Sequence, residues 1–354
     1  MSSTESLTVL IPTYNRHPQL LRLLRYAATV GCPYPMRVLD SSSDPLTSVE
    51  LRRALEADRI RHERWAPSTP PMQKLHEGLA HVASPYVVVW ADDDFLVPRA
   101  LTAGVSFLDA HPDYSVVHGR SYLLTVEQVN GHGVPSRQPY GQRAITAATA
   151  GERLDDHLRG YTVLNYAIHR AERLARNVAQ CVERGFGYNW GEIALGSLDA
   201  IQGKVGVLDQ LYLVKEGHQG PDAWWTWLCA GAATRPSDVF DWVTEANFPS
   251  AYASFRECVA AALSQEDRLT MDEARDIVKA AFWSYAARAL TEKRRAHDGM
   301  THRDASMRWR RAARRIPGLR GIVRAVRGGK GGAEPDWLPI YQAMTTKDVE
   351  MVAA

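Results

Sequence analysis

The sequence predicts an α/β fold with a mostly parallel central sheet, because short apolar runs alternate with segments of helical periodicity over the first 120 residues. The runs at 7–11, 36–40 and 86–91 are each followed by a polar turn and then by apolar residues three or four apart. The run YVVVWA at 86–91 is too apolar and β-branched to face water on either side, which predicts a central strand. With 354 residues, 45% of them hydrophobic, the chain can bury a sizeable core.

The remaining elements follow from the same two periodicities. Further strands are expected at 59–65, 114–119 and 205–215, and a loop rich in Gly, Pro and Gln at about 130–142. Helices are expected at about 18–28, 46–57, 72–82, 98–108, 147–159, 170–184, 191–202 and throughout 250–298.

Composition and targeting signals favour a cytoplasmic protein. The N-terminal residues lack the basic and apolar regions of a signal peptide, and no run of about 18 apolar residues predicts a transmembrane helix. The four cysteines are far apart and form no CxxC or Cys/His cluster, so we expect reduced thiols and no zinc site.

Polar residues stand where three of the expected strands end. The strand at 7–11 runs into PTYNR, the strand at 36–40 into DSSSD, and the strand at 86–91 into Asp92, Asp93 and Asp94. Ligands of open parallel sheets bind beyond the carboxyl ends of the strands, where such residues meet. Carboxylates there can bind a hard cation that bridges phosphate oxygens, and Arg16 or Lys74 can offset phosphate charge.

Two phosphate-binding motifs are absent from the sequence. No GxGxxG follows the first strand and no GxxxxGK[ST] occurs, which argues against ordinary dinucleotide-binding and P-loop proteins. Three adjacent aspartates repel one another unless a cation or hydrogen-bond donors offset their charge. The pattern therefore predicts a site for a nucleotide and a divalent cation.

Three segments together resemble glycosyltransferase family 2, whose members have the GT-A fold and use nucleotide-sugars. LTVLIPTYNRHPQLLRLL is similar to the first strand and turn of the family, and VLDSSSDP to its second. SPYVVVWADDDFLVPRAL is similar to its metal-binding DxD motif, including the proline that follows. The resemblance covers roughly residues 7–120 and continues more weakly to about 220.

The resemblance implies a role for each matching residue. Asp40 would meet the base, most often uracil, and Asp92 the ribose or the sugar. Asp93 would hold Mn²⁺ or Mg²⁺, with Asp94 beside it as a less certain ligand. The nucleotide-sugar pocket would be lined by Pro12, Thr13, Tyr14, Arg16 and Lys74.

The resemblance also implies an inverting reaction with a carboxylate as base. Family members carry an ED pair at the start of a helix, and the matching position here is Glu192, followed by Ile193 where the second acid would stand. Asp199 is the reserve for the base. His218 is similar to a histidine that some members place near the metal or the pyrophosphate, and a plain loop histidine remains the alternative.

The expected layout has a GT-A catalytic domain at 1–220, divided into a nucleotide-binding half (1–120) and an acceptor half (121–220). A helical region at 221–305 and a basic amphipathic tail at 306–354 follow. The partners implied are a nucleotide-sugar donor and a glycan, a lipid-linked molecule or a natural product as acceptor. Two alternatives stay open: a nucleotidyltransferase of related fold, and a nucleotide-sugar-binding protein without turnover.

The positive charge of the chain is concentrated near its C-terminus. Residues 293–330 hold 13 Lys or Arg against two Asp, while the whole chain has a net charge of +2. The segment 307–329 interleaves arginines with apolar residues, which suits a helix packed on the catalytic domain or a peripheral contact with an anionic membrane. Nucleic-acid binding is the weakest of the three interpretations.

Overall fold

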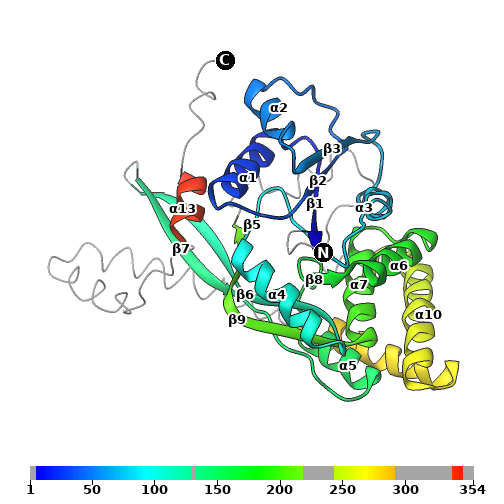
Figure 1. The fold of residues 1–354 in the computed structure, drawn as a ribbon. Helices are drawn as coiled ribbons and strands as arrows, with labels where there is room; N and C mark the ends of the chain where they lie inside the picture. Colours follow the sequence, from blue (N-terminus) through cyan, green and yellow to red (C-terminus); the bar gives the residue numbers. More distant parts are fainter. Residues whose placement is uncertain (1–4, 130–131, 218–242, 292–336, 346–354) are drawn as a thin grey trace, which may run out of the picture.

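The computed structural model describes residues 5–129, 132–217, 243–291 and 337–345. These residues form one mixed sheet with helices on both faces (Figure 1). The strands are β1 (Leu7–Thr13), β2 (Met36–Asp40), β3 (Ile60–Arg64), β4 (Tyr86–Val89), β5 (Phe95–Leu96), β6 (Tyr114–Val129), β7 (His132–Tyr140), β8 (Ile168–Arg170) and β9 (Lys204–Glu216). The α/β class expected from the sequence is confirmed.

The sheet has a parallel half and a mixed half. Its strand order is β3-β2-β1-β4-β8-β6-β9-β5, and β7 pairs with β6 outside this path. Strands β3, β2, β1 and β4 run parallel, whereas β8 is antiparallel to both of its neighbours, β4 and β6. Parallel order in the first half brings the carboxyl ends of β1, β2 and β4 to one edge of the sheet, where the polar residues follow.

The helices divide into two sets that cover opposite faces of the sheet. They are α1 (His17–Thr29), α2 (Val49–Leu55), α3 (Pro71–Leu79), α4 (Pro98–Ala110), α5 (Ala150–Arg159), α6 (Ala171–Glu183), α7 (Tyr188–Gln202), α10 (Phe248–Asp267), a helix at 271–291, and α13 (Trp337–Thr345). Side chains alternate across a strand, so Val9 of β1 joins the core with α1 and α4, while Leu10 joins the core with α3, α6 and α7.

The helical C-terminal extension is present and packs on the sheet domain. Helices α6, α7 and α10 lie side by side (Figure 1). Trp190 of α7 is stacked on Phe282 of the helix at 271–291, with ring centroids 5.8 Å apart, and also contacts Phe255 of α10. One continuous core therefore joins α7 to both C-terminal helices. The proposed domain boundaries stay a prediction.

The structure differs from the sequence prediction at the loop expected at 130–142. Residues 132–140 instead form β7, which pairs antiparallel with the far half of β6. Pro135 and Pro139 suggested a loop, but β7 pairs only with β6 among the described strands, and an edge strand tolerates residues that donate no ladder hydrogen bond. The helix α13 packs beside this hairpin, where Trp337 meets the ring of Tyr122 edge-on (Figure 1).

Some predictions concern residues outside the described ranges. These are His218 and the basic segment 307–329, including its proposed membrane contact, and both stay predictions. Within the described residues, no helix is both long and apolar enough to span a lipid bilayer. Cys32, Cys181 and Cys258 are buried free thiols, as expected.

Candidate active site

A pocket of about 570 Å³ opens at the carboxyl ends of β1 and β4. We call it the strand-end pocket. Segments 67–75 and 185–188 and the end of β9 complete its wall. The sequence-predicted residues that line it are Pro12, Thr13, Tyr14, Arg16, Lys74, Asp92, Asp93 and Asp94. The structure therefore brings together eight of the residues that the motifs singled out.

Arg16 ties two of the three aspartates together. Its guanidinium lies 2.7 Å from Asp92 Oδ1 and 2.8 Å from Asp93 Oδ2, and all three side chains are less than a tenth exposed. Thr13 Oγ1 donates a hydrogen bond of 2.7 Å to Asp92 Oδ2. The turn after β1 thus supplies the donors that let two neighbouring carboxylates stay buried.

Asp94 is held by the end of β9 rather than by the turn after β1. Its Oδ1 accepts a hydrogen bond of 3.1 Å from the backbone nitrogen of Glu216, and its Oδ2 lies 3.3 Å from Lys215 Nζ. Lys215 also faces the ring of Tyr166, 4.1 Å from the centroid. Both Lys215 and Tyr166 line the strand-end pocket.

Burial dominates the electrostatics of the aspartates. It raises the pKa of Asp92 to about 6, against the opposing charge of Arg16. Burial likewise raises the pKa of Asp94 to about 7, against the charge of Lys215. Additional positive charge in the pocket would therefore stabilise the ionised form of both carboxylates.

Lys74 reaches from α3 into the strand ends. Its Nζ donates to the carbonyl oxygen of Thr13, at 2.8 Å, and to Ser41 Oγ, at 2.9 Å. Burial lowers the pKa of Lys74 to about 8, although Asp92 and Asp40 oppose the shift. The ammonium group links the turns after β1 and β2 and lines the pocket.

Asp40 lies behind this pocket and is not one of the residues that line it. Its carboxylate accepts hydrogen bonds from the backbone nitrogen of Ser42, from His62 and from Arg64, at 2.8 to 3.0 Å. Burial opposes the charged form, but these donors outweigh it and the pKa of Asp40 is lowered. The ionised carboxylate organises the turn after β2. Its contact with the nucleobase of the donor stays a prediction.

Glu192 is the fifth residue of α7 and lies between two tyrosines. Tyr161 donates a hydrogen bond of 2.9 Å to Glu192 Oε1, and Tyr188 also bonds to this carboxylate. Burial raises the pKa of Glu192, while the two tyrosines and the charge of Lys215 act in the opposite direction. A carboxylate with a raised pKa is a stronger base, which is what the predicted role requires.

The reserve base lies elsewhere. Asp199 is 2% exposed, in the interior of α7 about two turns after Glu192. Its carboxylate lies 3.3 Å from His169 Nδ1 and 3.4 Å from Asn177 Nδ2, so it pairs with residues of the core. The structure gives Asp199 a place in the core, so Glu192 is the better placed of the two carboxylates.

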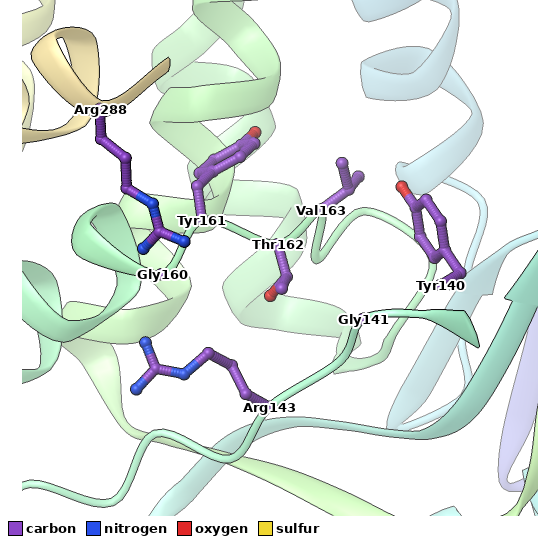
Figure 2. Close-up of a pocket in the computed structure, with 8 residues that line it drawn as sticks. All are labelled: Tyr140, Gly141, Arg143, Gly160, Tyr161, Thr162, Val163 and Arg288. Atoms are coloured by element: carbon purple, nitrogen blue, oxygen red, sulfur yellow. The ribbon is translucent and has the colours of Figure 1, made fainter. Parts of the chain in front are cut away.

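A second pocket, of about 630 Å³, has Tyr161 in its lining (Figure 2). We call it the two-arginine pocket, because Arg143 and Arg288 enter it from different segments. Tyr161 lines this pocket and bonds to Glu192, whereas Tyr188 lines the strand-end pocket and bonds to the same carboxylate. Glu192 itself lines neither pocket, but each of its two tyrosine partners lines one of them.

The donor set of the strand-end pocket fits a hard divalent cation. Asp93 and Asp94 are among the lining residues, and carboxylate oxygen is the ligand type that Mg²⁺ and Mn²⁺ prefer. Among the described residues, no three His, Cys, Asp or Glu side chains are grouped to hold a metal ion. Magnesium in nucleotide sites commonly uses one or two carboxylates and takes its other ligands from phosphate and water.

Sequence reasoning missed Lys215 and Tyr161 as site residues; it expected Tyr188 beside Glu192 through burial, but not as a hydrogen-bond donor. Lys215 comes late in a long strand, and pairing of β9 with β5 brings it beside Asp94. The tyrosines lacked a motif, although Tyr188 stands four residues before the proposed base, on the same helical face. Of the three residues, only Tyr188 stands within one helical turn of Glu192 in the sequence.

Comparisons with known proteins agree with the resemblance seen in the sequence. Residues 8–159 match the family model for glycosyl transferase family 2, which confirms that resemblance. The chain therefore carries a glycosyl transferase family 2 segment that includes the turn after β1, Lys74 and the three aspartates. This match supports a glycosyltransferase activity. Comparison with curated proteins gave no match.

The solved structures that resemble the chain include S. aureus TarS 1-349. In its complex with UDP-GlcNAc, the identity is 18%, the alignment covers 79% of this chain and 72% of that chain, and the TM-score is 0.48. For the complex with UDP the identity is 17%, with 78% and 70% covered and a TM-score of 0.46.

Proposed function

We propose that the protein transfers a sugar from a nucleotide-sugar, UDP-linked, to an acceptor hydroxyl with inversion at the anomeric carbon. The observation that carries this proposal is the strand-end pocket, in which the three aspartates, Arg16 and Lys74 meet inside the segment that matches family 2. Its volume of about 570 Å³ suits a small organic ligand.

The donor lies in the strand-end pocket. Tyr14 offers an aromatic face to the base, and Asp92 accepts hydrogen bonds from the ribose or the sugar. Lys74 and Arg16 balance the charge of the diphosphate. Arg16 is already shared by two carboxylates, so Lys74, which donates only to uncharged oxygens, is the stronger candidate for a phosphate contact.

Asp93, with Asp94 beside it, would hold Mn²⁺ or Mg²⁺. The cation would supply positive charge where the leaving diphosphate becomes more negative. The family resemblance and the carboxylates at the pocket wall support this assignment.

Glu192 removes the proton from the acceptor hydroxyl as the oxygen attacks the anomeric carbon. One displacement forms the new glycosidic bond, breaks the bond to the diphosphate and inverts the configuration. The hydrogen bonds from Tyr161 and Tyr188 hold the carboxylate in place, and burial raises its pKa toward the working pH. Trp190, two residues earlier and in the aromatic core, fixes the start of α7.

A thermal-shift panel of nucleotides and nucleotide-sugars, with Mn²⁺ and with a chelator, tests the donor. A ligand that binds the folded state at 100 times its Kd stabilises it by about 2.7 kcal/mol. We expect UDP and UDP-sugars to raise the Tm, more strongly with Mn²⁺. No shift with any nucleotide-sugar would contradict the proposal, and shifts with nucleoside triphosphates together with pyrophosphate release would favour a nucleotidyltransferase.

Turnover distinguishes an enzyme from a binding protein. We expect release of UDP from a UDP-sugar, lost on addition of a chelator and restored by Mn²⁺. Asp93→Asn should remove the response to Mn²⁺, and Glu192→Gln should reduce turnover while nucleotide binding is retained. Asp44→Asn and Glu183→Gln, at exposed positions that line neither pocket, are the matched controls. Full turnover in Asp93→Asn at saturating metal would refute the metal role.

A further inference from the structure

We propose that the acceptor is a hydrophobic alcohol, and that its apolar body lies in one end of the strand-end pocket, between α3, α6 and α7. The inference rests on the proposed glycosyl transfer and adds the place and the chemical class of the acceptor.

Six apolar side chains line this end of the pocket, and we call them the apolar lobe. They come from α3, α6, the turn after α6 and α7: Met72, Leu75, Leu174, Val182, Phe186 and Leu195. All six belong to one apolar cluster, and the three helices lie side by side (Figure 1). The pocket therefore extends from the carboxylates at the strand ends into an apolar cluster.

Helical spacing explains why these residues share a surface. Met72 and Leu75 stand three residues apart on α3, and Leu174 and Val182 eight apart on α6, so each pair lies on one face of its helix. Met72, Leu75 and Val182 are only half-buried. Part of this apolar surface is thus left for a ligand to cover.

The apolar lobe adjoins the helix that carries the proposed base. Tyr188 and Leu195 both line the strand-end pocket, and Glu192 stands between them, so the three share one face of α7. Glu192 itself is not a lining residue, but Tyr188 bonds to its carboxylate. A methyl group added at Gly191 would lie 2.4 Å from Met72 Cε, so the tip of Met72 rests on α7 one residue before Glu192. A hydroxyl on a body held in the lobe would stand beside the tyrosine that bonds to the base.

The chemistry of the apolar lobe excludes a sugar as its occupant. None of its six side chains carries a charge or a hydroxyl group, so a sugar ring among them would lose hydrogen bonds to water and gain none in return. An apolar body gains from burial instead, about fourfold in affinity for each methylene. The phosphates, ribose and sugar of the donor need polar partners, and its base faces Tyr14 in the proposed arrangement, which leaves the lobe to the acceptor.

Ligand-observed NMR titration of the full chain, with UDP at saturation, tests the inference. The probes are 1-butanol, 1-hexanol and 1,6-hexanediol, whose second hydroxyl stands at the end that would enter the lobe. We expect 1-hexanol to bind about tenfold more tightly than 1-butanol, and at least about tenfold more tightly than the diol. It should also increase UDP release from the UDP-sugar that binds best in the thermal-shift panel, as an acceptor does.

Two variants change the polarity of the apolar lobe and keep its size. Met72→Gln and Val182→Thr replace half-buried apolar side chains with polar ones of similar volume. Each should weaken the binding of 1-hexanol about fivefold and leave the binding of UDP unchanged. Met271→Gln and Val82→Thr are the matched controls, because both residues are half-buried against the same apolar cluster and line neither pocket.

UDP titration of the same samples separates the possible failures. If UDP binds and 1-hexanol binds no more tightly than 1-butanol or the diol, the acceptor inference is overturned while the donor proposal stands. It is overturned as well if 1-hexanol binds only without UDP, if it does not increase UDP release, or if both lobe variants bind it as the controls do. If UDP itself fails to bind wild-type protein, the proposed function fails first.

Discussion

The hydrogen bond from Tyr161 to Glu192 sets how strong a base this carboxylate can be. Tyr161→Phe removes the hydroxyl, which donates to Glu192 Oε1 at 2.9 Å, and keeps the ring between His157 and Tyr285. The hydrogen bond stabilises the ionised carboxylate, so its loss raises the pKa of Glu192 further above the ordinary value.

The size of this effect follows from the energy of one hydrogen bond to a charged group. Such a bond contributes about 1.5–3 kcal/mol, and one pKa unit corresponds to about 1.4 kcal/mol, so a rise of about 1 to 2 units is expected. A base must be ionised, so activity is lost as pH falls through its pKa. The acid limb of kcat/KM against pH should therefore move to higher pH in the variant.

The assay is UDP release from a UDP-sugar across the pH range, with wild-type and Tyr161→Phe protein. Tyr86→Phe is the matched control, because the Tyr86 hydroxyl also donates to a carboxylate, Asp109, at 2.6 Å, away from both pockets. The control should leave the acid limb in place. An unmoved acid limb in Tyr161→Phe, with activity retained, would refute Glu192 as the base.

Three further predictions concern the strand ends and the core. Arg16→Gln leaves two buried carboxylates without their shared cation, which should cost about 3–5 kcal/mol in urea unfolding; a loss below about 1 kcal/mol would contradict the pairing. The affinity for UDP, measured by calorimetry, should fall about tenfold between pH 7 and pH 9 as Lys74, with its pKa of about 8, loses its charge. The Lys74→Met variant should bind UDP weakly at both pH values. An equal pH dependence in that variant would show that Lys74 is not the phosphate contact. Gly104→Ala places a methyl group 2.4 Å from Ile168 Cδ1. The cost of overpacking, about 1–3 kcal/mol, should exceed the gain of about 1 kcal/mol in helix propensity, so the Tm should fall. A higher Tm would show that neighbouring side chains move to make room for the methyl group.

The parallel half of the sheet was predictable because its signals are local. The run at 36–40 became β2 (Met36–Asp40) with the same limits, and the run at 86–91 became β4 and the turn after it. Each strand is buried on both faces, so its composition alone identifies it. The polar residues after these strands converge because parallel strands end at one edge.

The mixed half was less predictable because long-range pairing decides it. Strand β6 was expected to end at 119 and extends to Val129, since β7 and β9 supply its partners. Strand β8 (Ile168–Arg170) was not predicted, and its last residue falls at the start of the helix expected at 170–184. The same holds around Lys215: Tyr140, Glu192 and Lys215 come from three distant segments, and no local sequence pattern predicts that they lie near one another.

Trp190 packs among the aromatic rings of α10 and of the helix at 271–291. This packing bears on how the sequence of the protein can diversify. The residues proposed to bind the donor lie within the matched segment 8–159, whereas Glu192 and Arg288 lie beyond it. Substitutions in the two C-terminal helices can thus shift α7, which carries Glu192 and contributes Tyr188 to the strand-end pocket, while β1, β4 and the three aspartates keep their own packing. Exchange of the C-terminal helices between related chains should therefore change the surroundings of the proposed base more than the strand ends.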